Sequence, residues 1–118
     1  MAKVLLYHNP GCSKSRGALA LLEPSGHSLE VVEYLEAPLS RTELETLLGQ
    51  LEEAPGALLR KDKHFKELGL DPSHYESRDA VVQILSEHPR LMQRPIAVAD
   101  GRAVIGRPPE RVLQLLGG

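Results

Sequence analysis

Residues 3–22 read KVLLYHNPGCSKSRGALALL, and this stretch decides the fold. Its first six residues, Lys3–His8, form a short apolar run that predicts a buried strand, and the Asn-Pro-Gly that follows predicts a sharp turn. From Ser13 to Glu23 the apolar residues recur at helical spacing, which predicts a helix that Pro24-Ser25-Gly26 ends. The single cysteine, Cys12, therefore stands where the first strand turns into the first helix.

The pattern outside this stretch predicts a second strand and then a helical middle segment. The strand is expected from Leu29 to Leu35. Ser40 and Glu43 fit a capping box, so a helix should begin there. Shorter helical turns are expected over residues 57–61 and 63–68, and Ser77 should cap a helix over residues 78–88.

The last third of the chain predicts a hairpin and a final helix. Asp100-Gly101 separates two short apolar runs, residues 95–99 and 102–105. A two-residue type I′ turn needs positive φ at both positions, which Asp-Gly supplies. Pro108-Pro109-Glu110 should begin the final helix, because proline and an acidic residue suit a helix N-terminus.

This order of elements predicts an α/β fold of the thioredoxin-like type. A βαβ unit is followed by a ββα unit, so we expect a mixed central sheet flanked by helices, with a helical insertion over about residues 40–90. A length of 118 residues predicts a single domain over residues 1–118.

Composition narrows the class of protein. Apolar residues are 42% of the chain, charged residues 25% and the net charge is −2, which is typical of a globular protein and argues against a nucleic-acid binder. No apolar run approaches the roughly 20 residues that span a bilayer, so no membrane association is expected. The N-terminus runs straight into the first strand, without the pattern of a signal peptide. We therefore expect a cytoplasmic protein, and a monomer by default.

The lone cysteine limits the chemistry. One thiol forms no intrachain disulfide and no Cys-rich zinc or iron–sulfur site, so redox chemistry would need a sulfur from another molecule. A thiol at a helix start has its pKa lowered by unpaired N–H groups and the helix dipole, and the thiolate is the reactive form. His8, Arg16 and residues 13–15 add donors near Cys12. The alternative is that Cys12 is a small buried apolar residue.

The stretch Tyr7–Arg16 resembles the active-site loop of the ArsC family, the glutaredoxin-linked arsenate reductases of bacteria. Its Cys-Ser-Lys-Ser sequence is most similar to that of the short chromosomal ArsC-like proteins. The resemblance extends over nearly the whole chain, in separated motifs in the same order. The further similar segments are Leu58–Lys61 with Phe65–Leu70, Leu91–Ile96, and Ile105–Glu110.

The resemblance implies roles for individual residues. Cys12 matches the nucleophile, His8 a residue that helps to lower the pKa of that thiol, and Ser15 a residue that hydrogen-bonds the thiolate. The arginines that match an oxyanion-binding set are Arg60, Arg94 and Arg107, and Arg16, one helical turn after Cys12, is expected to face the same side. Guanidinium groups suit this task because their planar fork pairs with oxyanions and stays charged. Taken singly, each arginine also fits a solvated surface position, and Arg94 fits the start of a strand.

Two further expectations concern the Arg94–Pro95 bond and metal binding. Pro95 matches the cis-proline that thioredoxin-like proteins place beside the active cysteine, so the Arg94–Pro95 bond should be cis. The remaining histidines are scattered without ligand spacing, so we expect no metal site.

The function that the resemblance implies is reduction of arsenate to arsenite through a Cys12 thiol–arsenate adduct. Glutathione is the implied co-substrate and glutaredoxin the implied partner, with no bound cofactor. Ser13-Lys14 departs from the Gly-Thr pair of plasmid-type reductases, which adds a charge and a side chain beside the expected oxyanion site.

Two alternative functions use the same fold or the same thiol. A glutathione-dependent thiol-disulfide oxidoreductase would use Cys12 but would not need three oxyanion arginines. A non-catalytic regulator similar to the Spx proteins would bind RNA polymerase. The Spx proteins typically carry a Cys-x-x-Cys switch, and here Ser15 occupies the place of the second cysteine.

Overall fold

The computed structural model describes residues 3–25 and 28–116, which form two compact units. The first unit runs to Ala37 and resumes at Arg94, and it contains the sheet. The second unit, Pro38–Gln93, is helical and corresponds to the expected helical insertion.

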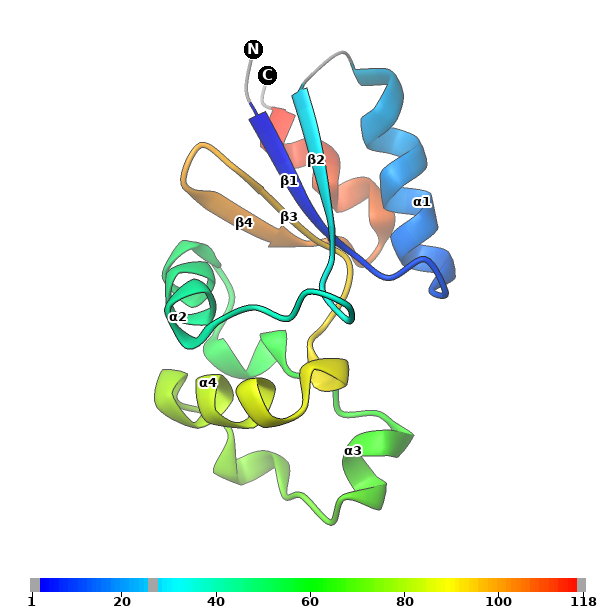
Figure 1. The fold of residues 1–118 in the computed structure, drawn as a ribbon. Helices are drawn as coiled ribbons and strands as arrows, with labels where there is room; N and C mark the ends of the chain where they lie inside the picture. Colours follow the sequence, from blue (N-terminus) through cyan, green and yellow to red (C-terminus); the bar gives the residue numbers. More distant parts are fainter. Residues whose placement is uncertain (1–2, 26–27, 117–118) are drawn as a thin grey trace. The chain divides into compact units, whose positions relative to one another are not determined.

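The first unit is built on a mixed sheet, which confirms the predicted fold class (Figure 1). In the described residues the strands lie in the order β2-β1-β3-β4. Their bounds are β1 Lys3–His8, β2 Ser28–Glu33, β3 Ile96–Ala99 and β4 Arg102–Ile105. β1 is parallel to β2, with Leu6 opposite Val31, and β3 is antiparallel to both β1 and β4. The parallel pair requires a crossover, which helix α1 (Ser13–Leu22) provides.

One hydrophobic cluster fixes α1 and the last helix, η5 (Pro109–Leu116), against the sheet. Leu6 of β1, Ala18 and Leu22 of α1, Val104 of β4 and Val112 of η5 all lie within it and are almost fully buried. In Figure 1 the blue α1 and the red η5 lie beside the sheet. Burial of these side chains supplies the main stabilisation of the first unit, because removing apolar surface from water is the dominant favourable term in folding.

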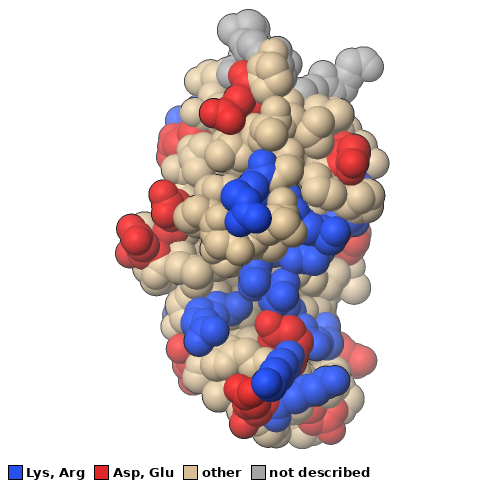
Figure 2. Space-filling model, turned by 90° about the vertical axis from the view of Figure 1, so that its right-hand side faces the viewer, with Lys and Arg blue, Asp and Glu red and all other residues tan. Residues whose placement is uncertain are grey.

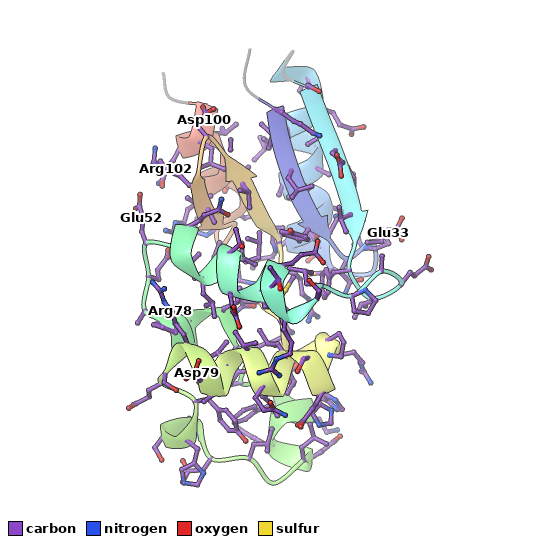
Figure 3. All side chains as sticks on the ribbon, turned by 60° about the vertical axis from the view of Figure 1, so that its left-hand side comes forward. Glu33, Glu52, Arg78, Asp79, Asp100 and Arg102 are labelled. Atoms are coloured by element: carbon purple, nitrogen blue, oxygen red, sulfur yellow. The ribbon has the colours of Figure 1, made fainter. Side chains whose placement is uncertain are left out.

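The second unit is organised by two capped helices that pack together, α2 (Arg41–Gln50) and α4 (Arg78–Glu87) (Figure 3). The predicted capping box is present: the Ser40 hydroxyl accepts a hydrogen bond from the Glu43 N–H, and the Glu43 carboxylate accepts one from the Ser40 N–H. Ser77 caps α4, as predicted. The shorter elements are η2 Pro55–Leu58, α3 Lys63–Glu67, η3 Pro72–His74 and η4 Pro89–Leu91.

The hairpin follows the prediction in its backbone angles. Asp100 and Gly101 have φ of 52° and 75°, which are the positive values that a type I′ turn requires. In Figure 3 the labelled Asp100 and Arg102 mark the turn end of β3 and β4. The Asp-Gly pair was therefore a sufficient indicator of this turn.

Strand β2 ends two residues earlier than predicted. The Glu33 carbonyl accepts hydrogen bonds from the N–H groups of both Glu36 and Ala37, at 3.0 Å each, and so closes a turn. Tyr34 lies in this turn and is 1% exposed. A buried aromatic residue extends the apolar pattern past the end of the strand, which is why periodicity placed the boundary at Leu35.

Several predicted helices differ in length or type. α1 ends at Leu22 and is followed by the 3-10 turn η1 (Glu23–Ser25). The turn expected over residues 57–61 is instead η2, which ends at Leu58.

The final helix is a 3-10 helix, and residues three apart share a face in such a helix. Val112 and Leu115 are accordingly buried, whereas Leu113 is 40% exposed.

Within the described ranges, no helix is long and apolar enough to cross a membrane.

At Gly106 the surrounding side chains leave no room for a Cβ atom. A Cβ atom there would lie 2.7 Å from Cγ of Pro95 and 3.0 Å from Cγ1 of Val112. Gly106→Ala should therefore destabilise the protein by about 1–3 kcal/mol through overpacking, measured as a lower urea midpoint. A Gly106→Ala midpoint at or above that of the wild type would contradict the packing argument.

Gly49 in α2 is the contrasting position. A Cβ there would meet nothing within 4 Å, so Gly49→Ala should raise the free energy of unfolding by about 0.5–1 kcal/mol.

Candidate active site

The turn between β1 and α1 is held by its own backbone and by Asn9. The Cys12 N–H donates to the Asn9 carbonyl at 3.0 Å, and the Asn9 Oδ1 accepts from the Gly11 N–H at 2.9 Å. Cys12 is the N-cap of α1, with an extended backbone, and its carbonyl accepts from the Arg16 N–H. The sulfur is therefore carried by the residue that directly precedes the helix, between the first strand and the first helix as the sequence predicts.

A buried hydrogen bond ties the end of β1 to the first turn of α1. His8 Nδ1 and Ser15 Oγ lie 2.7 Å apart, and both residues are buried. The same Oγ accepts from the Asn9 N–H at 3.0 Å. Because a buried polar group without a partner costs about 1–3 kcal/mol, this arrangement strongly favours one conformation of the turn.

The Cys12 thiol has a lowered pKa. Burial raises it, but the backbone N–H of Ser15, a side-chain hydrogen bond from Arg94 and the backbone N–H of Lys14 together lower it further than burial raises it. The thiol is partly exposed, so a reactant can approach it. These are the conditions under which a cysteine is nucleophilic.

Arg94 and Arg107 bring two guanidinium groups to the thiol, although they are far from it in sequence. Arg107 Nη2 lies 3.7 Å from Cys12 Sγ, and its Nε donates to the Arg94 carbonyl at 2.9 Å. Within the described part of the chain, Arg94 Nε is buried and has no hydrogen-bond partner. The Arg94–Pro95 bond is cis, as the resemblance implied, and the Arg107–Pro108 bond is cis as well. Two positively charged guanidinium groups therefore lie beside the sulfur.

The other two expected arginines have partners of their own. Arg16 Nη1 donates to the Pro10 carbonyl at 2.9 Å, so this guanidinium supports the turn. Arg60 belongs to the second unit, where its Nε donates to Asp62 Oδ2 at 2.7 Å. That carboxylate also caps α3. The binding of an oxyanion by Arg16 or Arg60 stays a prediction.

His8 has a lowered pKa, chiefly because it is buried. The Glu33 carboxylate, labelled in Figure 3 at the end of β2, opposes this shift, and the Arg16 guanidinium adds to it. The neutral ring is therefore favoured at pH 7.

The sequence placed Asn9 in the turn after the first strand and Pro108 at the start of the last helix, but we did not predict the Asn9 side-chain hydrogen bond or the cis bond before Pro108. The Asn9 hydrogen bond was predictable, because an asparagine before Pro-Gly commonly bonds to the backbone two residues on. The Arg107–Pro108 pair repeats the Arg-Pro pattern of residues 94–95, but a local sequence gives no indication of which bond is cis. No group of three or more metal-ligating side chains occurs among the described residues.

The pH dependence of Cys12 alkylation tests this electrostatic arrangement. Because the pKa of the thiol is lowered, the rate of reaction with iodoacetamide should reach half its plateau below pH 8.5, the value of an unperturbed thiol. Arg94→Gln removes a donor and a charge from the sulfur, so its midpoint should be higher.

Lys3→Gln is the matched control, since Lys3 pairs with Glu30 at the other end of β1. A wild-type midpoint at 8.5 or above, or equal shifts in both variants, would contradict the arrangement.

Comparisons with known proteins agree with the observed fold and identify the family of the chain. Residues 7–115 match the ArsC family. The chain is 42% identical to an arsenate reductase of Neisseria meningitidis, over 98% of this chain and 100% of that one. It is 46% identical to the uncharacterized protein YfgD of Escherichia coli, with 98% of each chain covered. A solved structure, an arsenate reductase from Vibrio cholerae, matches with a TM-score of 0.86 and 46% identity, over 96% of this chain and 97% of that one. The chain therefore belongs to the ArsC family.

Proposed function

We propose that this protein is an oxidoreductase that reduces arsenate to arsenite. The observation that carries the proposal is the Cys12 thiol of lowered pKa, with Arg107 Nη2 3.7 Å from its sulfur and Arg94 hydrogen-bonded to it. The names of the relatives from Neisseria meningitidis and Vibrio cholerae support the choice of arsenate.

The first step is attack of the Cys12 thiolate on arsenic. An S–As bond forms, an As–O bond breaks, and hydroxide or water leaves, which gives a thiol–arsenate adduct. Arsenate and thiolate are both anions, so cations must offset their repulsion. Arg94 and Arg107 are placed for this, and the unpartnered Nε of Arg94 offers a donor to an arsenate oxygen. In this proposal Arg16, which lies in the same unit, adds a further cation.

The second step needs another thiol, because the chain has one cysteine. A glutathione thiolate attacks the Cys12 sulfur, an S–S bond forms, the S–As bond breaks, and its electron pair reduces arsenic so that arsenite leaves. Glutaredoxin then reduces the mixed disulfide and frees Cys12. In this proposal the cycle uses no bound cofactor, and its free thiols favour a reducing compartment such as the cytoplasm.

Cys12→Ser tests the cycle directly. A hydroxyl in place of the thiol forms no S–As bond, so the variant should lose turnover in an assay that couples arsenate to NADPH oxidation through glutathione and glutaredoxin. Ser73→Ala, an exposed position in the second unit, should retain the wild-type rate. An active Cys12→Ser variant or an inactive wild type would refute arsenate reduction by this site.

A glutathione-dependent thiol-disulfide oxidoreductase is the second candidate, because a thiol of lowered pKa serves that reaction as well. Arg94→Ala separates the two. At a pH above the thiol pKa of both proteins, loss of the arginine should lower arsenate reduction by about tenfold or more and disulfide exchange much less, because only arsenate brings an oxyanion. Equal losses in the two assays would favour the disulfide enzyme.

A further inference from the structure

The turn that leads into Cys12 has a conformation that its sequence does not favour. Pro10 and Gly11 occupy its two central positions, and the Cys12 N–H closes it on the Asn9 carbonyl at 3.0 Å. Proline followed by glycine favours a type II turn, in which the glycine has a positive φ. Gly11 does not have a positive φ, so the turn is of type I.

The two turn types differ by a rotation of the central peptide group, between Pro10 and Gly11, and two side chains hold this group at both ends. Its N–H donates to Asn9 Oδ1 at 2.9 Å, and its carbonyl accepts from Arg16 Nη1 at 2.9 Å. Rotation to type II would turn the N–H and the carbonyl to the opposite sides, and would therefore break both hydrogen bonds. Asn9 and Arg16 thus stabilise type I against the preference of the Pro-Gly pair.

A turn in the second unit, residues 71–74, has the same hydrogen bonds but no glycine. Asp71 Oδ1 accepts from the Ser73 N–H at 2.9 Å, and the His74 N–H donates to the Asp71 carbonyl at 3.0 Å. Serine rarely adopts a positive φ, so this turn stays in type I without help from a side chain. The hydrogen bond from the first side chain therefore decides the turn type only where the third residue is glycine, as it is before Cys12.

Asn9 supplies its oxygen without a charge. An aspartate in its place, as at residue 71, would put a negative charge in the turn that carries the thiol, and a nearby negative charge raises the pKa of a thiol. On the upper part of the face in Figure 2, which belongs to the first unit, basic side chains lie centrally and acidic ones lie toward the margins. Asparagine therefore suits the turn before Cys12.

We propose that Asn9 is a positioning residue for the Cys12 nucleophile, which together with Arg16 holds the peptide group before Gly11 in its type I orientation. Gly11 directly precedes Cys12, so rotation of this peptide changes the direction from which the chain enters Cys12 and moves the sulfur relative to its hydrogen-bond donors. The inference rests on the proposed function for the reaction that Cys12 performs, but the position of the sulfur is measurable without arsenate.

Asn9→Ala removes the acceptor of the Gly11 N–H and no charge. The midpoint of the pH dependence of Cys12 alkylation by iodoacetamide should rise by about half a pH unit, because type II becomes populated and the sulfur loses part of its hydrogen bonding. At a pH below both midpoints the rate should fall about threefold, in proportion to the thiolate. The charged and titratable side chains near the thiol and near His8 are unchanged in this variant: His8, Arg16, Glu33, Arg94 and Arg107.

Gly11→Ala in the Asn9→Ala background should restore the wild-type midpoint. A Cβ atom disfavours positive φ, so alanine keeps the turn in type I without the hydrogen bond. In the wild type this Cβ would lie 3.3 Å from Asn9 Oδ1, and the Asn9→Ala substitution removes that contact. The rescue therefore tests the orientation of the peptide group and not the hydrogen bond as such.

Asp71→Ala is the matched control, because it removes the same hydrogen bond from a turn that has no glycine. Its alkylation midpoint should equal that of the wild type, even where its melting temperature falls as much as that of Asn9→Ala. A midpoint that does not rise in Asn9→Ala, a double variant that stays shifted, or an equal rise in Asp71→Ala would overturn the role of Asn9.

The outcomes separate this inference from the proposed function. A midpoint that is shifted in Asn9→Ala and restored in the double variant, in a protein that reduces no arsenate, would support the role of Asn9 and refute arsenate reduction. Where arsenate is reduced, kcat/KM at a pH below the midpoints should fall in Asn9→Ala and recover in the double variant. Arsenate reduction with an unshifted Asn9→Ala midpoint would leave the proposed function standing and overturn the role of Asn9.

Discussion

The hydrogen bond between His8 and Ser15 is the constraint on which the site depends. It joins the last residue of a central strand to the first turn of the helix that follows, inside the protein. Because Ser15 Oγ also accepts a hydrogen bond from the Asn9 N–H, the five residues between Asn9 and Ser15 have little conformational freedom. The helix start is thereby fixed, and with it the direction of the Lys14 and Ser15 N–H groups that lower the pKa of Cys12. Cysteine reactivity in this fold is a consequence of how a strand is attached to a helix.

The charges around the sulfur follow a division between buried and exposed groups. Arg94 and Arg107 are partly buried and are oriented by the chain: Arg107 donates to the Arg94 carbonyl as well as approaching the sulfur. Such fixed donors need little rearrangement when charge develops nearby, which is the condition for strong electrostatic stabilisation. Exposed charges such as Lys14 interact more weakly with an anion, because salt screens them. The partly buried arginines are therefore the groups that suit the reacting oxyanion.

Local features of the sequence were enough to predict most helices and strands, but not which residues distant in sequence come together at the site. The Ser40–Glu43 capping box and the Asp100-Gly101 turn each depend on residues that are close together in sequence, and the structure contains both. The end of β2 was placed too late because the buried Tyr34 continues the apolar pattern through a turn. Arg107 is 95 residues from Cys12 in sequence, so no periodicity reports their contact. Only the resemblance to a family pointed to it, and the tertiary structure supplies the reason.

The intermediate exposure of Cys12 meets two opposing requirements: a lowered thiol pKa and access to the sulfur from solvent. A fully buried thiol would be inaccessible to a second thiol, and burial alone would raise its pKa. A fully exposed thiol would lose the N–H groups and the guanidinium that favour the thiolate. Cys12 is intermediate, at a helix start whose N–H groups approach it from the protein side. The proposed cycle, in which an external thiol attacks the same sulfur, requires this position, because the sulfur has to be activated from one side and remain open on the other.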